Sequence, residues 1–246
     1  TLCKTCYEEQ NDKKESEKIM SKQIWRPGNM LYPVPAVLVS VADSAGNDNL
    51  ITIAWTGTVC SDPAMTYISV RKERYSHHML KENKEFVINL VSKEICRAAD
   101  FCGVRSGRDL DKFEATGLTR EKASTVNVPL VKESPVNIEC KVTQVLELGS
   151  HDMFLAKVTA VQVDESLLDE KGKLDLNKAH LVAYSHGEYQ TFDNILGTFG
   201  YSVKKKVKKE ALTKKSSSDN SCQLLIPNAC FRKILQNCYM NMSLLQ

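Results

Sequence analysis

Two long runs of alternating apolar and polar residues constrain the fold more than any other feature of this sequence. Residues 137–148 (NIECKVTQVLEL) and 153–164 (MFLAKVTAVQVD) follow one another and are joined by a turn sequence around Gly149. Alternation with a period of two is typical of strands with one buried face, so we expect a long antiparallel pair. Strands of this length favour a closed antiparallel barrel, because closure removes the exposed edges of a sheet. The predicted fold class is therefore mainly β.

The preceding part of the chain contains further strand and helix signals. Residues 35–42 and 49–63 flank the turn sequence DSAGND and predict a hairpin whose second strand ends at Asp62-Pro63. The remaining expectations are strands at 66–71 and 85–91, a short helix at 75–84 with Ser76 as N-cap, and two helical segments within 92–116 that break between Gly103 and Gly107, with Ser92, Ser106 or Asp109 as caps.

The charge distribution divides the chain into three parts. Residues 204–246 hold 9 Lys and Arg against 2 Asp and Glu, so the formal net charge of +3 comes from this tail and the rest is mildly acidic. Net charge therefore gives no reason to expect nucleic-acid binding. Residues 1–19 are charged and aperiodic, which is typical of a disordered extension. We expect a folded domain at 20–206 and a basic, then apolar tail at 207–246 outside it.

Cysteine usage and hydropathy bear on the compartment. The nine cysteines are scattered without a compact framework, which favours a reducing environment, and we expect a cytoplasmic protein. The pair Cys3 and Cys6 has ligand spacing, but the second pair that zinc requires does not follow, so no metal is expected. No apolar run is long enough for a membrane span. Rossmann, P-loop, zinc-protease and nucleophile-elbow motifs are all missing from the sequence.

The stretch NLITIAWTGTVCSDP at 49–63 carries the first chemical signal. Alternation places apolar side chains, Trp55 among them, on one face and threonine hydroxyls on the other, while Gly57 allows a ligand or a second backbone to come close. An ordinary strand with β-favouring threonines is the simpler interpretation of these residues alone.

Basic residues precede two predicted helices. Arg71, Lys72 and Arg74 lie just before the helix at 75–84, where outward amides and the helix dipole favour an anion. A solvated basic turn is the alternative. Arg108 precedes the next helical start and is expected to bind an anion or to form an ion pair. His151 lies in the turn of the long hairpin, where an exposed histidine is the simpler interpretation.

Taken in order, several stretches resemble the flavin reductase-like, FMN-binding split-barrel family, especially its flavoredoxin-like members. The resemblance spans about residues 24–206 and rests on YPVPAVLVSV, NLITIAWTG, SVRKERYS, ADFCGVRSGRDLDKF, PVNIECKV, ELGSHDMFLAKV and GEYQTFDNILGTFGYSV. It implies a six-stranded antiparallel split barrel with Greek-key elements, a homodimer, and one FMN per subunit at or near the dimer interface.

The resemblance also implies a set of cofactor contacts, since FMN requires a flat apolar surface, polar groups and cations for its phosphate. Tyr189 departs from the family pattern, because many relatives have tryptophan at the next position, where this chain has Gln190. The predicted contacts are Asn49, Trp55, Thr56, Gly57 and Thr58 at the flavin or ribityl chain, Arg71, Lys72 and Ser76 at the phosphate, and Arg108, Lys112, His151 and Tyr189 as further contacts.

The implied function is an FMN-binding oxidoreductase that passes electrons from a reduced nicotinamide or a protein donor to flavin, iron or another acceptor. Its chemistry would take place at N5 of the flavin, so no catalytic side chain is expected. Two alternatives remain open. One is a non-enzymatic electron carrier that exchanges electrons with a redox protein, and the other is a flavin-storage or regulatory module.

Overall fold

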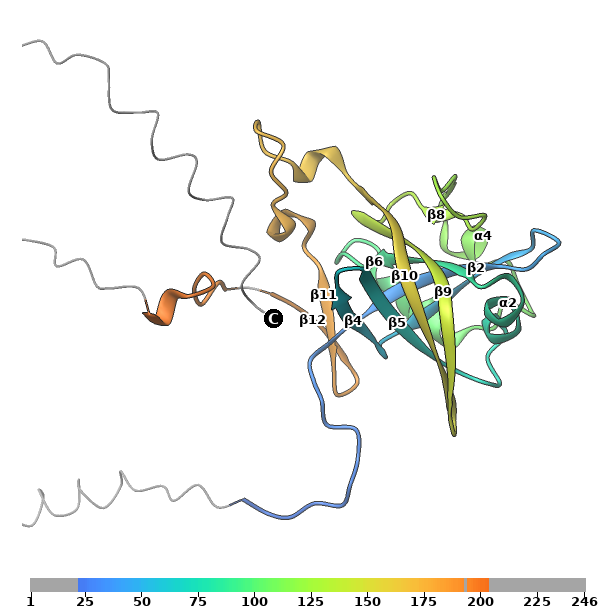
Figure 1. The fold of residues 1–246 in the computed structure, drawn as a ribbon, viewed down its shortest axis with the longest axis horizontal. Helices are drawn as coiled ribbons and strands as arrows, with labels where there is room; N and C mark the ends of the chain where they lie inside the picture. The colour runs from blue at the N-terminus through green and yellow to red at the C-terminus, as the bar shows by residue number, and fades with distance from the viewer. Residues whose placement is uncertain (1–21, 193, 204–246) are drawn as a thin grey trace, which may run out of the picture. The chain divides into compact units, whose positions relative to one another are not determined.

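The computed structural model describes residues 22–192 and 194–203 (Figure 1). The expected extension at 1–19 and the expected tail at 207–246 lie outside these residues. The chain divides into two units after Leu196. In the second unit the described residues include a short 3-10 helix, η3 (Tyr201–Val203). All other described elements belong to the first unit.

A seven-stranded antiparallel sheet forms the body of the first unit. Its strands follow the order β3-β2-β6-β9-β10-β5-β4. Their bounds are β2 Val37–Ala42, β3 Asp48–Ile53, β4 Thr56–Ser61, β5 Ala64–Arg71, β6 Glu85–Leu90, β9 Val136–Leu148 and β10 His151–Val163.

The two edges of this sheet are joined by consecutive residues. β3 and β4 lie at opposite ends of the strand order, yet only Ala54 and Trp55 separate them in the chain. The backbone carbonyl of Trp55 accepts a 2.8 Å hydrogen bond from the amide of Ser69 on β5, which ties the junction to the opposite edge. The sheet therefore closes on itself. Counted as one bent strand, β3 and β4 bring the total to the six strands expected, and the predicted mainly β barrel is confirmed.

The long hairpin predicted from the alternating runs is β9 and β10. Its register places Leu148 opposite His151, and Gly149 in the turn has a positive φ of 68°. The side chains of Phe154 and Ala156 point inward and are fully buried, whereas that of Met153 lies on the outer face and is only half-buried. Toward the hairpin tip β9 continues past its pairing with β6, whereas β10 is paired with β5 from His151 onward, and the tip projects from the barrel (Figure 1).

Three α-helices lie where the sequence predicts helices: α2 (Ser76–Asn83), α3 (Cys96–Val104) and α4 (Lys112–Thr116). Their caps differ from expectation. Ser76 is the first residue of α2, and its hydroxyl accepts a hydrogen bond from Asn49 instead of capping the helix. α3 has no side-chain cap, and Asp111 caps α4 by accepting from the amides of Phe113 and Glu114.

The shorter elements were not predicted. They are β1 (Val34–Pro35), β11 (Val182–Ser185) and β12 (Glu188–Thr191), which form a three-stranded sheet; β7 (Arg120–Glu121) and β8 (Leu130–Val131), which pair; and the 3-10 helices η1 (Glu165–Leu167) and η2 (Leu176–Ala179).

Two hydrophobic cores meet at β2, all six residues of which are buried. Val39 points into the barrel toward Phe154 and its neighbours, whereas Leu38 packs on the other face against Phe113 and Ala99 of the helical layer. Burial on both faces explains why residues 35–42 form an almost continuous apolar run without alternation. No helix in the described ranges is long and apolar enough to cross a membrane.

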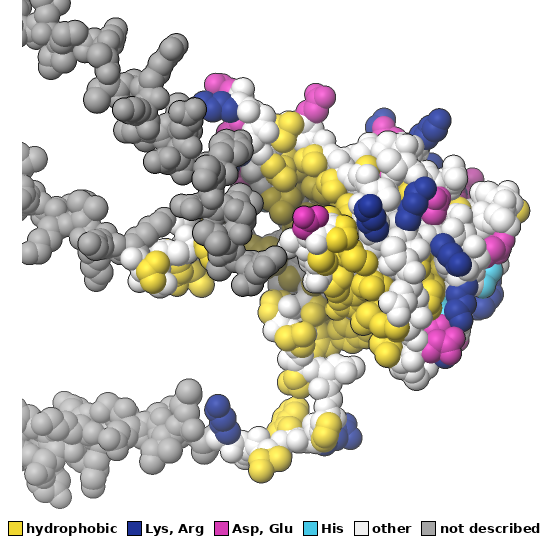
Figure 2. Space-filling model, viewed as in Figure 1, with side chains coloured by type: hydrophobic (Ala, Val, Ile, Leu, Met, Phe, Trp, Pro, Cys, Tyr) yellow, Lys and Arg dark blue, Asp and Glu magenta, His cyan; other side chains and the backbone are white. Residues whose placement is uncertain are grey.

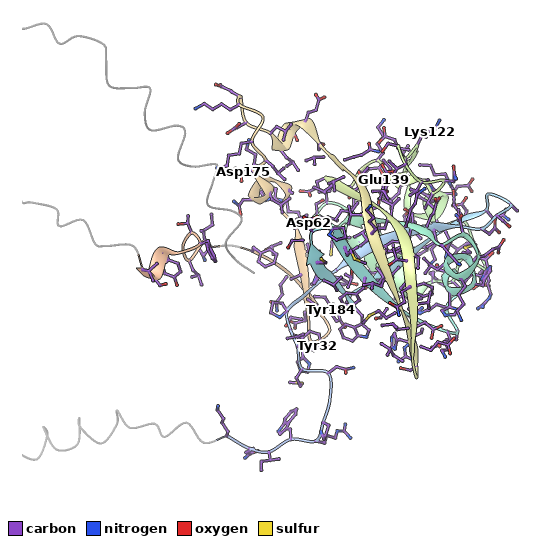
Figure 3. The ribbon with its side chains drawn as sticks, in the orientation of Figure 1. Tyr32, Asp62, Lys122, Glu139, Asp175 and Tyr184 are labelled. Carbon is purple, nitrogen blue, oxygen red and sulfur yellow. The ribbon has the colours of Figure 1, made fainter. Side chains whose placement is uncertain are left out.

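A buried carboxylate fixes the loop that follows β7. Glu139 on β9 (Figure 3) is fully buried and accepts hydrogen bonds from the amides and hydroxyls of Ser124 and Thr125 and from the side chain of Gln162. Burial alone would raise the pKa of Glu139, but these donors outweigh it and lower the pKa to about 2.

Candidate functional site

Two adjoining cavities lie between the sheet and the helical layer. The first, which we call the aromatic chamber, has a volume of about 340 Å³ and is lined by Trp55 and three tyrosines. The second, the basic chamber, has about 500 Å³ and is lined by five cations. Four residues line both chambers, so the two form one continuous site: Ile51, Arg71, Arg74 and Val104.

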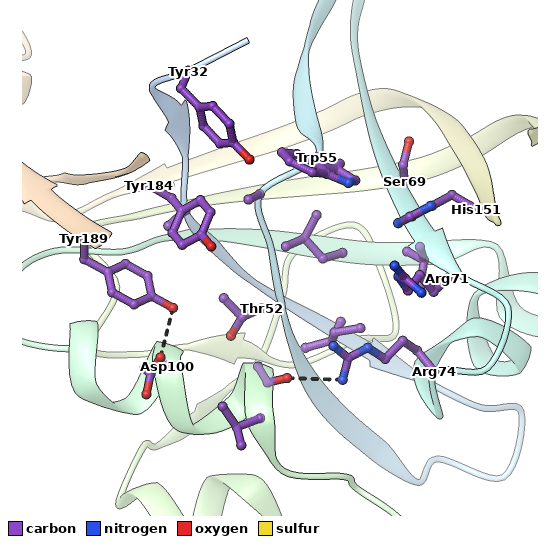
Figure 4. A pocket seen from close by; sticks show the side chains of 17 residues that line it. Tyr32, Thr52, Trp55, Ser69, Arg71, Arg74, Asp100, His151, Tyr184 and Tyr189 are labelled. Carbon is purple, nitrogen blue, oxygen red and sulfur yellow. Dashed lines mark hydrogen bonds between the residues drawn. The ribbon is translucent and has the colours of Figure 1, made fainter. Parts of the chain in front are cut away.

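Four aromatic rings from separate segments line the aromatic chamber (Figure 4). Ring centroids of Tyr32 lie 6.2 Å from Trp55 and 6.2 Å from Tyr184, and Tyr184 lies 5.6 Å from Tyr189. The tyrosine hydroxyls point into the cavity, and that of Tyr189 donates to Oδ1 of Asp100 over 3.3 Å. Burial and the Asp100 carboxylate together raise the pKa of Tyr189 to about 12, so this phenol stays protonated at neutral pH.

The carboxyl end of α3 holds two of the cations in the basic chamber. Nη1 of Arg74 donates to the carbonyl of Gly103 over 3.1 Å, and Nζ of Lys112 donates to the carbonyls of Cys102 and Leu50, both over 2.7 Å. Carbonyl groups at the end of a helix lack partners and favour positive charge, which accounts for this placement. Lys112 is almost fully buried, and burial lowers its pKa to about 8.

The cations of the basic chamber carry little compensating charge. Arg71 pairs with Glu73 over 3.2 Å, whereas none of the other four forms an ion pair with a carboxylate of the described residues. These four are Arg74, Arg105, Arg108 and Lys112. The guanidinium of Arg108 instead lies 5.5 Å from the ring centroid of Tyr75. Such an excess of positive charge in a cavity attracts an anion.

A close approach of three residues shapes the floor of the basic chamber. Nδ2 of buried Asn49 donates to Oγ of Ser76 over 2.8 Å, which joins β3 to α2. Gly107 lies directly against this amide: a Cβ atom at position 107 would be 2.2 Å from Oδ1 of Asn49. Only glycine fits here, because any side chain would displace Asn49.

His151 faces the aromatic chamber from the start of β10. It pairs with Arg71 of β5 in the sheet, and its Nδ1 lies 2.9 Å from the hydroxyl of Ser150. Burial and the nearby positive charge of Arg71 lower the pKa of His151 below its usual value. Its imidazole is therefore neutral at pH 7, and it offers a hydrogen bond without adding charge.

Comparisons with known proteins identify the family. The family model described as "Flavin reductase like domain" matches residues 29–193. The chain belongs to the flavin reductase-like family. Flavoredoxin of Desulfovibrio vulgaris (Miyazaki F) is 32% identical and superposes with a TM-score of 0.70, over 75% of this chain and 100% of that one. The resemblance seen in the sequence is thereby confirmed.

Two further proteins extend this similarity. An uncharacterized protein of Pyrococcus abyssi is 32% identical over 165 residues, which cover 67% of this chain and 94% of that protein. A structure described as an FMN-binding protein from Thermus thermophilus, with bound 1-cyclohex-2-enone, is 25% identical with a TM-score of 0.59, over 70% of this chain and 96% of the other.

The flavin reductase-like fold brings most of the residues singled out in the sequence to this site. The aromatic chamber is lined by Trp55, Arg71, His151 and Tyr189, and the basic chamber by Asn49, Arg71, Ser76, Arg108 and Lys112.

Four of the predicted residues line neither chamber. Buried Thr56 donates to the carbonyl of Tyr67, and Gly57 lies against the ring of the same tyrosine. Thr58 is exposed. Lys72 points to the other side of the hairpin, where its Nζ lies 3.4 Å from Asp152.

Several residues of the site were not among the predicted cofactor contacts. Arg74 was placed in the basic run that favours an anion, but the resemblance added only Arg71 and Lys72 of that run as contacts. Tyr32 precedes β1 and Tyr184 lies on β11, two strands too short to show a sequence period, and Asp100 is one of many polar residues in the helical region. Among the described residues, no group of three His, Cys, Asp or Glu side chains is placed to hold a metal ion.

Proposed function

We propose that the two chambers together bind FMN and that the protein is an FMN-dependent oxidoreductase. The observation that carries this proposal is the pairing of an aromatic cavity with a cavity in which four of the five cations form no ion pair with a carboxylate of the described residues. FMN has the matching shape, because a flat ring system is joined by a short polar chain to a doubly charged phosphate. Membership of the flavin reductase-like family and similarity to an FMN-binding protein support the same cofactor.

Each part of the site then has a defined role. Trp55 and the tyrosines supply flat apolar surface for the ring system, with hydroxyls at its edge. Arg74, Arg108 and Lys112 neutralise the phosphate in a partly enclosed setting, where charge-assisted hydrogen bonds are strong. When bound, FMN supplies hydride and single-electron chemistry that no protein side chain provides. The protein binds and orients it.

Binding is tested by titrating purified protein with FMN and following the quenching of flavin fluorescence. We expect saturable quenching at one FMN per chain. Arg74→Gln removes a cation of the basic chamber and is expected to weaken binding by about tenfold or more, because a hydrogen bond to a charged group contributes roughly 1.5–3 kcal/mol. Lys72→Gln is the matched control, since Lys72 belongs to the same basic run but lines neither chamber. Equal affinity of both variants would refute this assignment of the site.

We further propose that the bound FMN accepts electrons from a reduced nicotinamide. Anaerobic mixing with NADH or NADPH is expected to bleach the visible flavin band. Similarity to flavoredoxin favours a second candidate, an electron carrier served by a protein donor. Failure of both nicotinamides to bleach the flavin at saturation would exclude the reductase and leave the carrier.

We also propose that two copies of the chain pair through the outer face of the sheet. Side chains from the neighbouring strands β5, β10 and β9 give this face an apolar character. Figure 2 shows hydrophobic groups gathered over β4, β5 and β10. Leu146 and Leu148 are 36% and 53% exposed, and a contiguous exposed apolar patch is typical of a protein–protein interaction site. The residues of this face are Met65, Tyr67, Leu146, Leu148, Met153 and Leu155. Sedimentation equilibrium is expected to give twice the chain mass, and a monomer at micromolar concentration would contradict the proposal.

A further inference from the structure

A third cavity, which we call the apolar chamber, adjoins the aromatic chamber. It has a volume of about 670 Å³ and shares four wall residues with the aromatic chamber: Ala54, Trp55, Ser69 and His151. The FMN site proposed above does not use this space. Its remaining wall includes Met30, Leu31, Tyr67, Leu148 and Met153, which come from the segment before β1 and from the outer face of the sheet. Tyr67, Leu148 and Met153 also belong to the face proposed for pairing, so a paired second copy would border this chamber.

The apolar chamber carries no charge in the part of the chain that the structure describes. No Asp, Glu, Lys or Arg of the described residues lines it, and burial and the charge of Arg71 lower the pKa of its one histidine, His151, below the usual value. The basic chamber, by contrast, is lined by five cations and one carboxylate. Charge is therefore segregated along the site, and an anionic ligand finds no compensating group in the apolar chamber.

The surfaces of the apolar chamber suit a flat ring. Trp55 and Tyr67 supply aromatic faces, and Met30 and Met153 supply polarizable thioethers, which pack favourably against aromatic ligands. The hydroxyl of Ser69 and the imidazole of His151 lie in the shared wall as polar groups for a carbonyl oxygen. A neutral ring with carbonyl oxygens matches all of these features.

We propose that the apolar chamber binds the electron acceptor and that this acceptor is an uncharged, flat molecule of the quinone class. The inference rests on the proposed FMN site, because the shared wall places the acceptor beside the aromatic chamber. The acceptor gains two electrons and two protons and becomes a hydroquinone. Both electrons would come from the reduced cofactor, one at a time across the shared wall, as the cofactor releases its protons to the solvent, and the solvent would supply the two protons of the hydroquinone.

The first test compares two probes that differ only in charge, naphthoquinone and naphthoquinone sulfonate. FMN-loaded protein is reduced with light under anaerobic conditions, so that no nicotinamide donor is needed. The reduced protein is mixed with each quinone in a stopped-flow instrument. We expect the rate of flavin reoxidation to saturate with naphthoquinone, and the sulfonate to require about tenfold or more higher concentration, because burial of its charge is uncompensated. Linear dependence on both probes would overturn the proposal.

Two variants locate the binding site. Met153→Lys places a charge on the wall of the apolar chamber and should reverse the preference, with weaker saturation by naphthoquinone and tighter saturation by the sulfonate. Leu146→Lys is the matched control: Leu146 lies opposite Met153 on β9, on the same face, but does not line the chamber. The Leu146→Lys variant therefore reproduces any effect that a lysine on this face has on the pairing of two copies. Identical constants for both variants would refute the assignment to this cavity.

A readout without flavin separates this inference from the proposed function. The chain has two tryptophans, and Trp25 is largely exposed, so Trp25→Phe leaves Trp55 of the shared wall as the only indole. Naphthoquinone should quench the fluorescence of Trp55 in the protein without FMN, and Met153→Lys but not Leu146→Lys should weaken the quenching. Quenching without FMN binding would refute the proposed function alone, whereas FMN binding without selective quenching would refute the acceptor site alone.

Discussion

Replacing Gly107 by alanine tests the geometry on which the floor of the basic chamber depends. The new Cβ atom would lie 2.2 Å from Oδ1 of Asn49, whereas Cβ atoms rarely approach another atom closer than 3.4 Å. Asn49 must therefore move by roughly 1 Å into the chamber, since a Cβ contact this short is not tolerated. Such a shift breaks the 2.8 Å hydrogen bond from Asn49 to Ser76.

The expected cost of Gly107→Ala follows from burial of that hydrogen bond. Asn49 and Ser76 are 4% and 1% exposed, so water cannot replace the lost partner. Leaving a buried polar group unpaired costs about 1–3 kcal/mol. For a domain of this size, each kcal/mol lowers Tm by about 2–4 °C, which predicts a decrease of about 2–12 °C. The backbone itself tolerates alanine, because φ of Gly107 is not positive.

A double-mutant cycle isolates the proposed contact. Urea denaturation is measured for Gly107→Ala, Asn49→Ala and the double variant. With Asn49 truncated, the new methyl group meets no amide, and Gly107→Ala should then cost less than about 0.5 kcal/mol. FMN titration of the same proteins reports whether the chamber keeps its shape. If Gly107→Ala lowers the free energy of unfolding equally in the wild-type protein and in the Asn49→Ala variant, the clash with Asn49 is not the cause.

Three further perturbations test other parts of the molecule. The pKa of Glu139 is lowered from 4.5 to about 2, so its contribution to the free energy of unfolding is complete above pH 4.5 and is lost as the pH falls toward 2. In urea denaturation, Glu139→Gln should lack this pH dependence and should lose on the order of 3 kcal/mol of unfolding free energy at pH 7. Asp111→Ala removes the cap of α4 and should lower the free energy of unfolding by about 1 kcal/mol, whereas Asp109→Ala should leave it nearly unchanged. Lys112 is protonated below its pKa of about 8, so FMN affinity measured by fluorescence should fall as the pH rises through 8, and Lys112→Met should bind FMN more weakly with no such fall.

The sequence predicts the barrel well because its strands carry local signals. Alternation identified β9 and β10 almost to the residue, and the kink at Trp55 lies within a segment read as one strand. The three-stranded sheet of β1, β11 and β12 was missed for the opposite reason. Its strands have two or four residues each, too few to establish a period, and pairing between residues 34 and 184 depends on the finished barrel.

The site was predictable in proportion to how local its chemistry is. Arg71 was singled out because its basic run directly precedes a predicted helix, whereas Ser76 and Lys112 were expected as contacts only from the family resemblance. The helix caps were assigned less well, since Ser76 has two possible partners, and only packing decides that its hydroxyl meets Asn49 and not its own helix. Charge alone did not separate Arg74 from Lys72 either. In the turn after Arg71, the side chain of Arg74 lies in the chamber and donates to Gly103, whereas that of Lys72 lies near Asp152 on the other side of the hairpin.

The junction of β3 and β4 explains why two cavities meet at one residue. A barrel sheet whose edges are joined by consecutive residues must bend sharply at the junction, and here the bend falls at Ala54 and Trp55. The large side chain at the bend cannot lie in either strand's regular alternation, so its two faces are free to line separate spaces. Trp55 accordingly forms part of the wall of both the aromatic and the apolar chamber. A cofactor on one side and a second substrate on the other would then be separated by one indole, which makes Trp55 the residue whose size sets their approach.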